Sequence, residues 1–389
     1  MLIFYYLYFK IARIILCFNT NFDEYFCYIL TLYVFDFLLA VWYYAFMSNF
    51  VYVALSGGVD SAAAAILLKE RGYDVRGVIL RLKPGDLADA DIRDAQLVAD
   101  ALSIPLEILD ERESFKSITD YFCRAYMQGL TPNPCVLCNP TIKFGKLVDY
   151  ALKNGAEFLA TGHYSNIVCE NGVYYIKRNP SSKDQSYFLC GLNQHILSHV
   201  HFPLSDYSKD EIRSIVESHD IPVAHKKDSQ EVCFIPDNDY ISFIEKQFNP
   251  EAVPGDFLST SGEKLGTHSG LYKYTIGQRK GLGAFGKPMY VISINPESNS
   301  VTIGDNEELF KTEIFIKDIN FLAGKSPADE FDCQVKIRCA ARPADATLTL
   351  TEDGAKITFS APQRAAAPGQ TAAIYKGDIL IGGGTICNP

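Results

Sequence analysis

The chain has 389 residues, which is too long for one ordinary hydrophobic core, so we expect two or three domains. Its formal charge of −10 excludes a general electrostatic attraction to nucleic acid, so an RNA substrate would have to meet local basic patches. The eleven cysteines are odd in number and scattered, which argues against a secreted disulfide framework and favours reduced thiols in the cytoplasm.

Residues 1–46 differ from the rest of the chain, because they are rich in aromatic and aliphatic side chains. Residues 25–46 form an apolar stretch long enough to span a bilayer. Asp36, near its middle, would cost about 2.5–3.5 kcal/mol in a membrane, and no basic cluster flanks the stretch. A cleaved signal peptide fits no better, since a charged start and a small-residue cleavage site are lacking. We expect an extension outside the fold that arises from a wrongly chosen start codon upstream of Met47, with a membrane anchor as the alternative.

The segment SGGVDS at residues 56–61 follows an apolar run and precedes an apolar-periodic stretch, which predicts a glycine-rich turn from a strand into a helix. Two glycines let the backbone approach an anion, and the first N–H groups of the helix point toward it. The spacing excludes the P-loop and the dinucleotide fingerprint. The remaining match is the pyrophosphate-binding loop of ATP pyrophosphatases, where Asp60 would hold Mg²⁺. An ordinary strand-to-helix turn is the alternative.

Strands and helices alternate from residue 50 onward, which predicts a parallel sheet with crossover helices. We expect strands at 51–55, 75–80, 106–109 and 158–161, and helices at 62–71, 91–102, 115–128 and 143–154. Ligands of such sheets lie at the carboxyl ends of the strands. The loop at 56–61, Leu80 and Gly162-His163 are therefore expected to meet at one nucleotide, although for His163 alone a capping or core histidine is the preferred interpretation.

The segment TPNPCVLCN at residues 131–139 places Cys135 and Cys138 three residues apart in a loop held by prolines. Structural zinc would need a second ligand pair that the sequence lacks, and a thioredoxin-like dithiol would need a helix start after a strand. A third interpretation adds the distant Cys233, where the preceding Lys226 and Lys227 favour the thiolate. Together with an adenylating loop, these thiols suggest sulfur transfer through a persulfide, whereas an inert, half-buried Cys233 is the alternative.

The pattern changes after residue 236. A helical pattern at 239–247 is followed by short glycine-punctuated strands, which predict a small second module to about residue 309. From residue 315 onward regular short strands predict an antiparallel barrel, with hairpin turns at 353–354 and 376–378.

Over residues 47–389 the chain resembles the bacterial and organellar tRNA-specific 2-thiouridylases, the MnmA/TrmU family. The resemblance rests on SGGVDS, TPNPCVLCN, ATGHY at 160–164, KDQSYFL at 183–189, DSQEVCFIP at 228–236 and YTIGQRKGLG at 274–283, in the family's order. It implies a Rossmann-like ATP pyrophosphatase domain at 47–237, a central domain at 238–311 and a C-terminal β-barrel at 312–389. The implied reaction replaces the C2 oxygen of the wobble uridine (position 34) of tRNA with sulfur.

The resemblance also implies the roles of individual residues. Cys138 would be the nucleophile, Cys233 would carry the persulfide, and a disulfide between them would release the product. ATP and Mg²⁺ would be used, with ATP bound by Ala54, Leu55, Ser56, Gly57, Gly58, Val59, Asp60, Ser61, Leu80 and Gly162. Asn133, Pro134 and Cys135 would border the target base, and the tRNA would contact Lys183, Asp184, Gln185, Arg338 and Cys339. Sulfur would come from a cysteine desulfurase relay, and no membrane is expected.

Two residues depart from the family's pattern. Many members have an aspartate where Cys135 stands, proposed as a general acid or base, and often a tyrosine where Cys339 stands. Cys135, Cys138 and Cys233 could instead hold a 4Fe–4S cluster, so persulfide and cluster mechanisms both stay open. The rival enzymes are a different tRNA thiolase and the amide-forming synthetases that share the loop; a membrane-tethered nucleotide- or RNA-binding protein is the non-enzymatic rival.

A wobble uridine must leave its stack to be modified, so the RNA has to meet a positive surface around a polar pocket. We expect basic side chains to supply that surface: Lys143, Lys146, Lys177, Arg178, Lys226, Lys227, Arg279 and Lys280.

Overall fold

The computed structural model describes residues 50–83, 85–181, 183–226, 232–235 and 238–388, without the side chains of residues 86–88. The extension expected at residues 1–46 and the side chain of Lys227 lie outside the described residues. Among the helices that the structure describes, none is both long enough and apolar enough to cross a membrane.

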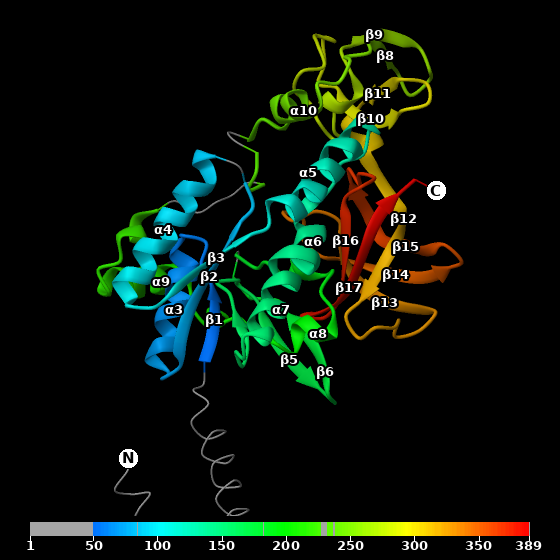
Figure 1. The fold of residues 1–389 in the computed structure, drawn as a ribbon. Coiled ribbons are helices and arrows are strands. Elements are labelled where there is room, and N and C mark those ends of the chain that lie inside the picture. Colours follow the sequence, from blue (N-terminus) through cyan, green and yellow to red (C-terminus); the bar gives the residue numbers. More distant parts are fainter. Residues whose placement is uncertain (1–49, 84, 182, 227–231, 236–237, 389) are drawn as a thin grey trace, which may run out of the picture. The chain divides into compact units, whose positions relative to one another are not determined.

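A five-stranded parallel sheet in the order β3-β2-β1-β4-β7 forms the framework of the first domain, as predicted (Figure 1). Its strands are β1 (Phe50–Ala54), β2 (Asp74–Arg81), β3 (Leu106–Asp110), β4 (Leu159–Ala160) and β7 (Val200–His201). Strand β1 is an uninterrupted apolar run because parallel strands are covered on both faces. Strand β7 was not predicted, since two residues are too short to carry a periodic signal.

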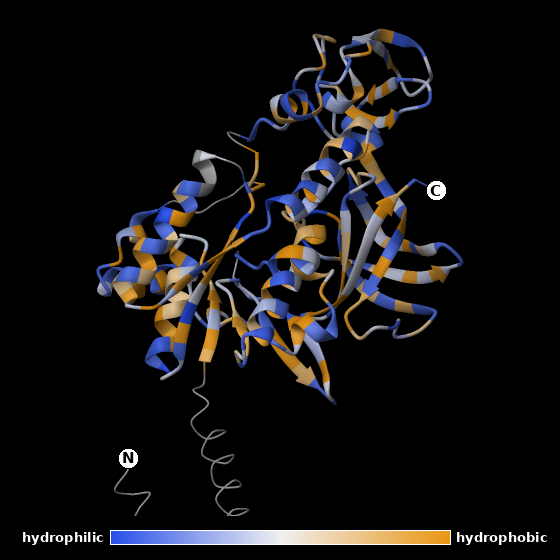
Figure 2. Cartoon of the chain, in the orientation of Figure 1, coloured by the Kyte–Doolittle hydropathy of each residue, from blue (hydrophilic) through white to orange (hydrophobic). Residues whose placement is uncertain are grey.

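Helices cover both faces of this sheet. The helices of this domain are α3 (Val59–Glu70), α4 (Asp86–Leu102), α5 (Arg112–Met127), α6 (Pro134–Cys138), α7 (Gly145–Lys153), α8 (Gln194–Leu197) and α9 (Lys209–Ser218). The side chains of Val51 and Val53 share a core with α3, α4 and α9, whereas Tyr52 faces the opposite way toward Tyr150 of α7. Figure 2 shows hydrophobic residues concentrated on the central strands and mixed with hydrophilic ones on the helices. This mixture is the expected pattern for helices with one buried face.

Short helical turns connect the longer elements. A π-helical turn, η1 (Asn139–Lys143), follows α6 directly, so the predicted helix at 143–154 begins at Gly145 rather than at residue 143. The 3-10 turns are η2 (Ser186–Leu189), η3 (Pro222–His225), η5 (Leu271–Lys273) and η6 (Asn306–Leu309).

The central region is a small four-stranded sheet in the order β10-β11-β8-β9, preceded by helix α10 (Tyr240–Phe248). The side chain of Asp239 caps α10 by accepting a hydrogen bond from the backbone of Ser242. The strands are β8 (Gly255–Leu258), β9 (Lys264–His268), β10 (Tyr290–Asn295) and β11 (Ser300–Gly304).

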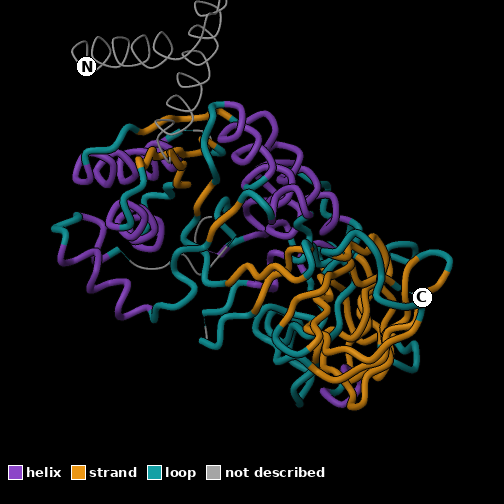
Figure 3. The backbone as a smooth tube through the Cα atoms, turned by 90° about the horizontal axis from the view of Figure 1, so that it is seen from below, coloured by secondary structure: helices purple, strands orange, loops and turns teal. Residues whose placement is uncertain are grey.

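Six antiparallel strands close into a barrel in the order β12-β15-β14-β13-β16-β17, with β17 also paired to β12. They are β12 (Phe310–Phe321), β13 (Glu330–Lys336), β14 (Ala344–Thr351), β15 (Gly354–Arg364), β16 (Thr371–Lys376) and β17 (Ile379–Cys387). Figure 3 shows these strands as one closed group beside the C-terminus. Both predicted hairpin turns are confirmed, because β14 turns into β15 and β16 turns into β17 at those positions.

The barrel sheet incorporates a hairpin from the first domain, which the sequence did not reveal. Strands β5 (Asn166–Glu170) and β6 (Val173–Lys177) extend it, with β6 paired antiparallel to β17. Backbone N–H of Thr131 also donates to Pro368 O at 2.8 Å, and Tyr187 Oη donates to Thr371 O at 2.9 Å. These bonds hold the loop before α6 against the barrel.

Candidate active site

The glycine-rich turn at residues 56–61 joins the carboxyl end of β1 to α3. Gly57 adopts a left-handed φ of +70°, and a Cβ there would lie 2.7 Å from Asp94 Cβ, so only glycine fits. Ser61 Oγ accepts from the backbone N–H of Ser56 at 3.1 Å and donates to Gly58 O at 3.0 Å. No side chain caps the start of α3. Its first N–H groups therefore remain available to an anion.

Gly162 follows β4 and packs directly against this turn. Its Cβ, if present, would lie 2.6 Å from the carbonyl carbon of Asp60 and 2.8 Å from the nitrogen of Ser61. Strand β4 is the parallel neighbour of β1, so the predicted convergence of strand ends is present in the structure. Leu80, at the end of β2, is half-buried against the aromatic cluster that contains Cys138.

His163 is half-buried and its ring lies 5.2 Å from that of Phe144 and 5.7 Å from that of Phe202. Its Nδ1 pairs with Thr161 Oγ1 at 2.8 Å. Burial, and secondly the charge of Lys143, lower the pKa of His163 to about 3. The imidazole is therefore neutral at physiological pH.

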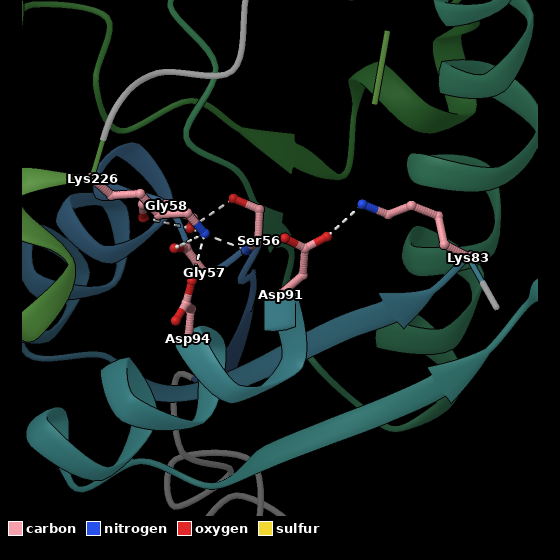
Figure 4. A network of polar contacts seen from close by, with 8 residues as sticks. Ser56, Gly57, Gly58, Lys83, Asp91, Asp94 and Lys226 are labelled. Atoms are coloured by element: carbon pink, nitrogen blue, oxygen red, sulfur yellow. Dashed lines mark hydrogen bonds and ion pairs between the residues drawn. The ribbon is translucent and has the colours of Figure 1, made fainter. Parts of the chain in front are cut away.

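Three aspartate–lysine pairs surround the phosphate turn (Figure 4 shows two). Asp60 accepts from Lys209 Nζ and from Tyr164 Oη, each at 2.7 Å. The other two pairs, both at α4, are Asp94 with Lys226 at 2.6 Å and Asp91 with Lys83 at 2.7 Å. The cradle that a Cβ would fill and the carboxylate oxygens beside it fit a nucleoside triphosphate with Mg²⁺, with Asp60 as the residue that would hold the metal.

The thiol-bearing segment begins with Asn133 as N-cap and Pro134 as the first residue of α6. Cys135 is half-buried, and Cys138 is buried in a cluster with Phe122 and Phe234 rather than exposed as the sequence suggested. The ring of Phe234 lies edge-on to two rings of α5, at 5.3 Å from Phe122 and 5.6 Å from Phe115. This packing holds the segment of Cys233 beside Cys138 while the Cys233 side chain stays exposed.

Lys143, at the end of η1, faces all three of these thiols, with which its charge interacts. Burial raises the pKa of Cys135 and raises that of Cys138 to about 12, and Lys143 is the largest influence in the opposite direction on both. Burial alone would lower the pKa of Lys143, but the sulfurs of Cys233, Cys135 and Cys138 raise it overall. In the described part of the chain, no carboxylate pairs with Lys143. The positive charge of Lys143 therefore acts on the three thiols.

Within the described residues, no three histidine, cysteine or acidic side chains are grouped closely enough to hold a metal ion. Cys135, Cys138 and Cys233 are all described, and they do not form such a group.

The residues expected to contact tRNA are partly engaged in internal bonds. Asp184 accepts from the backbone of Asn179 and from Ser186 Oγ, at 3.1 and 2.8 Å. The backbone N–H of Gln185 donates to Tyr164 O at 3.1 Å, and its side-chain oxygen accepts from the backbone of Tyr164 at 3.0 Å. This pair of bonds ties the segment of Asp184 and Gln185 to the turn that carries Gly162.

Asn133 hydrogen-bonds the hydroxyl of Tyr187 and so reaches toward the barrel. Cys339 is exposed and lies near Asp184 and Lys336, whose charges influence its thiol. Arg338, which was expected to contact tRNA, makes hydrogen bonds within the protein. Its guanidinium donates to the carbonyls of Ile276 and Ala365 at 2.8 and 3.0 Å, and bridges the central region and the barrel.

Lys143 and Lys226 were expected on an RNA-facing surface, but Lys143 lies among the thiols and Lys226 bonds to the phosphate turn and to Asp94. Sequence reasoning therefore missed their roles. A lysine five residues after Cys138 was the available signal for Lys143. For Lys226, the signal was the i, i+3 spacing of Asp91 and Asp94, which places both carboxylates on one face of α4. Lys183 is half-buried in the same loop as Asp184.

Three family models match the chain in succession. They are the tRNA methyl transferase HUP domain at residues 49–237, the tRNA methyl transferase PRC-barrel domain at 241–305 and the Aminomethyltransferase beta-barrel domain at 311–386. The tRNA-specific 2-thiouridylase MnmA of Clostridioides difficile is 44% identical over 88% of this chain and 99% of its own length. The tRNA-specific 2-thiouridylase MnmA 2 of Clostridium botulinum strain Hall is 44% identical over 86% of this chain and 98% of its own.

Among solved structures, the chain is similar to the U34-tRNA thiolase NcsA from Methanococcus maripaludis. The TM-score is 0.34 and the identity 19%, over 51% of this chain and 63% of that one. A likeness at this level carries no argument about function.

Proposed function

This chain belongs to the family of tRNA-specific 2-thiouridylases, and we propose that it replaces the C2 oxygen of the wobble uridine (position 34) of tRNA with sulfur, through an adenylated uridine and a cysteine persulfide. The observation that carries this proposal is that the strand end next to the phosphate turn and the thiols of Cys138 and Cys233 lie around the same lysine, Lys143. Gly162 contacts the turn, and the adjacent His163 and the thiols of Cys138 and Cys233 all feel the charge of Lys143.

In the first step, the uridine O2 attacks the α-phosphorus of ATP, and pyrophosphate leaves. Backbone N–H groups at the start of α3 stabilise the phosphates. Asp60 would hold Mg²⁺, which would supply positive charge next to the leaving pyrophosphate. The bound nucleotide lies along Ala54, Leu55, Ser56, Gly57, Gly58, Val59, Ser61 and Gly162, with the adenine near Leu80. Adenylation converts a poor leaving group at C2 into AMP.

In the second step, the terminal sulfur of a persulfide on Cys233 attacks C2, and AMP leaves. The thiolate of Cys138 then attacks the sulfur of Cys233, which forms a disulfide and releases 2-thiouridine. An external thiol must reduce the disulfide before the next turnover. Exposure of Cys233 supports its role as the carrier, because it has to receive sulfur from a donor protein, which we propose is a cysteine desulfurase relay. Lys143 favours the thiolate at Cys138.

The target base is proposed to lie against Asn133, Pro134 and Cys135, next to Cys138. Further tRNA contacts are assigned to Lys183, Asp184, Gln185, Arg338 and Cys339. The thiol of Cys135 has a raised pKa, so it stays neutral and does not act as a general base in place of an aspartate. In this chain the proton transfer is then either dispensable or carried out by another group.

We propose domain boundaries at residues 237 and 311, with residues 1–46 outside the catalytic fold. A protein that begins at Met47 tests this division and should thiolate tRNA as fast as the full chain. We propose a cytoplasmic location, which a tRNA substrate supports.

Nucleoside mass spectrometry of a wobble-uridine tRNA incubated with ATP, Mg²⁺ and a sulfur donor tests the function. A 2-thiouridine peak that requires ATP is expected. ATP cleavage to AMP without any thiolated nucleoside would instead favour an amide-forming synthetase. Iron analysis of the anaerobically purified enzyme decides between mechanisms, since full activity without iron supports the persulfide and activity proportional to iron supports a cluster.

A further inference from the structure

Lys226 lies beside the phosphate turn, although its position in the sequence suggested a role next to Cys233. Its Nζ donates to Asp94 at 2.6 Å and to the carbonyl oxygen of Gly57 at 3.2 Å (Figure 4). Lys226 follows η3, which packs on α4, so its backbone is anchored on the helix that also carries Asp94. The ammonium is thus placed against the segment of chain that receives phosphates.

The position of Asp94 next to the phosphate turn calls for a compensating positive charge. The Cβ of Asp94 occupies the space where a side chain at Gly57 would be, so α4 brings a carboxylate next to an anion cradle. An uncompensated carboxylate would repel a polyphosphate. The Lys226 ammonium cancels that charge, and the Lys226 side chain remains 37% exposed, so an incoming ligand can reach it.

The other two pairs differ in a way that singles out Lys226. The side chain of Lys209 is 13% exposed, and its partner Asp60 is also bonded to Tyr164, so this pair is held by its surroundings. Lys83 pairs with Asp91 at 2.7 Å, and none of its described bonds goes to the turn at 56–61.

We propose that Lys226 is a phosphate-binding residue of the nucleotide site. Its ammonium pairs with Asp94 before the nucleotide binds and turns to the β- and γ-phosphoryl oxygens when Mg²⁺·ATP binds. The inference rests on the proposed use of ATP by this turn. In the exchange, the ammonium gives up one carboxylate oxygen and gains phosphoryl oxygens that carry more negative charge. Asp94 stays close to the Lys226 side chain after the exchange, so its charge remains partly compensated.

A purely structural role makes a different prediction. If the pair only fastens α4 to the turn, removing either partner has the same effect on every nucleotide. If Lys226 binds the outer phosphates, only its own removal weakens binding, and only for ligands that carry those phosphates.

Calorimetric titration of the full chain with α,β-methylene-ATP, inorganic pyrophosphate and AMP, each with Mg²⁺ and without tRNA, separates the two roles. Lys226→Met is expected to weaken α,β-methylene-ATP and pyrophosphate about ten- to a hundredfold, the loss of one or two charge-assisted hydrogen bonds. AMP binding should change by less than about twofold. Asp94→Asn should bind all three ligands at least as tightly as the unmodified chain.

The matched control is Lys83→Met, which removes the neighbouring pair and should leave all three affinities within about twofold. Lys226→Gln keeps a donor for Asp94 and Gly57 without the charge, and it replaces the methionine variant if that one does not fold. Equal losses for AMP and α,β-methylene-ATP, or equal losses in the Lys226 and Asp94 variants, would overturn the proposal.

The proposed function is tested separately by the nucleoside assay. A chain that prefers α,β-methylene-ATP to AMP through Lys226 but makes no 2-thiouridine would overturn the function and leave this inference standing. A chain that makes 2-thiouridine, but whose nucleotide affinities do not change when Lys226 is replaced, would support the function and overturn this inference.

Discussion

Gly162→Ala perturbs the contact between β4 and the phosphate turn without removing any functional group. The added Cβ would lie 2.6 Å from the carbonyl carbon of Asp60, 2.8 Å from its oxygen and 2.8 Å from the nitrogen of Ser61. All three are backbone atoms, so no side-chain rotation relieves the overlap. Since carbon contacts are comfortable only from about 3.5 Å, the turn and the strand must separate by roughly 1 Å.

A displacement of about 1 Å between bound phosphates and the reacting groups costs about a hundredfold in rate, or about 2.7 kcal/mol in transition-state stabilisation. We therefore expect kcat/KM for ATP in tRNA thiolation to fall about a hundredfold in this variant. Steady-state rates of 2-thiouridine formation at varied ATP, quantified by nucleoside mass spectrometry, measure the change.

Gly266→Ala is the control, because its Cβ would meet only Phe257 Cδ2, at an ordinary 3.7 Å, in the central sheet. It should change kcat/KM by less than about twofold. An unchanged kcat/KM in Gly162→Ala, in a protein with a normal thermal transition, would refute the close packing of β4 on the phosphate turn.

Three further predictions concern the thiols and the domain contact. Cys138→Ser and Cys233→Ser should each reduce 2-thiouridine formation by about a thousandfold or more, whereas Cys169→Ser, exposed on β5, should not reduce it; nucleoside mass spectrometry of the three variants decides. Because burial raises the pKa of Cys138 to about 12, its thiolate fraction should grow about tenfold per pH unit from pH 7 to 9. Peptide mass spectrometry of the alkylated residue measures this, and an alkylation rate that levels off within that range would contradict it. Tyr187→Phe leaves the buried carbonyl of Thr371 without its donor and should destabilise the domain contact by about 1–3 kcal/mol; an unchanged transition in differential scanning calorimetry would argue that water replaces the hydroxyl.

The sequence was sufficient for features that a local pattern encodes. The apolar run of β1, the glycine pair at 57–58 and the turn residues of the barrel hairpins have local physical causes, and all are present as predicted. The contact of Gly162 with the phosphate turn followed from a general rule about parallel strand ends rather than from its own sequence neighbours, whereas a place for Leu80 at the same site stays a prediction.

Features that depend on long-range packing were not predictable in this way. The β5–β6 hairpin joins the barrel through a partner about two hundred residues away, which no periodicity records. Cys138 looked exposed because prolines flank it, yet aromatic residues from α5 and from the segment of Phe234 cover it. Arg338 and Lys226 read as surface cations, and only the fold shows the carbonyls and the carboxylate that they bind.

The central claim is that Cys233 delivers sulfur and Cys138 resolves it in a site that the phosphate turn activates. A single turnover with persulfide-loaded enzyme and a wobble-uridine tRNA, followed by non-reducing peptide mass spectrometry, tests it most directly. The account predicts a disulfide between Cys138 and Cys233 that appears in equal amount to 2-thiouridine, and only when ATP is present. Formation of 2-thiouridine while both thiols remain free would contradict it.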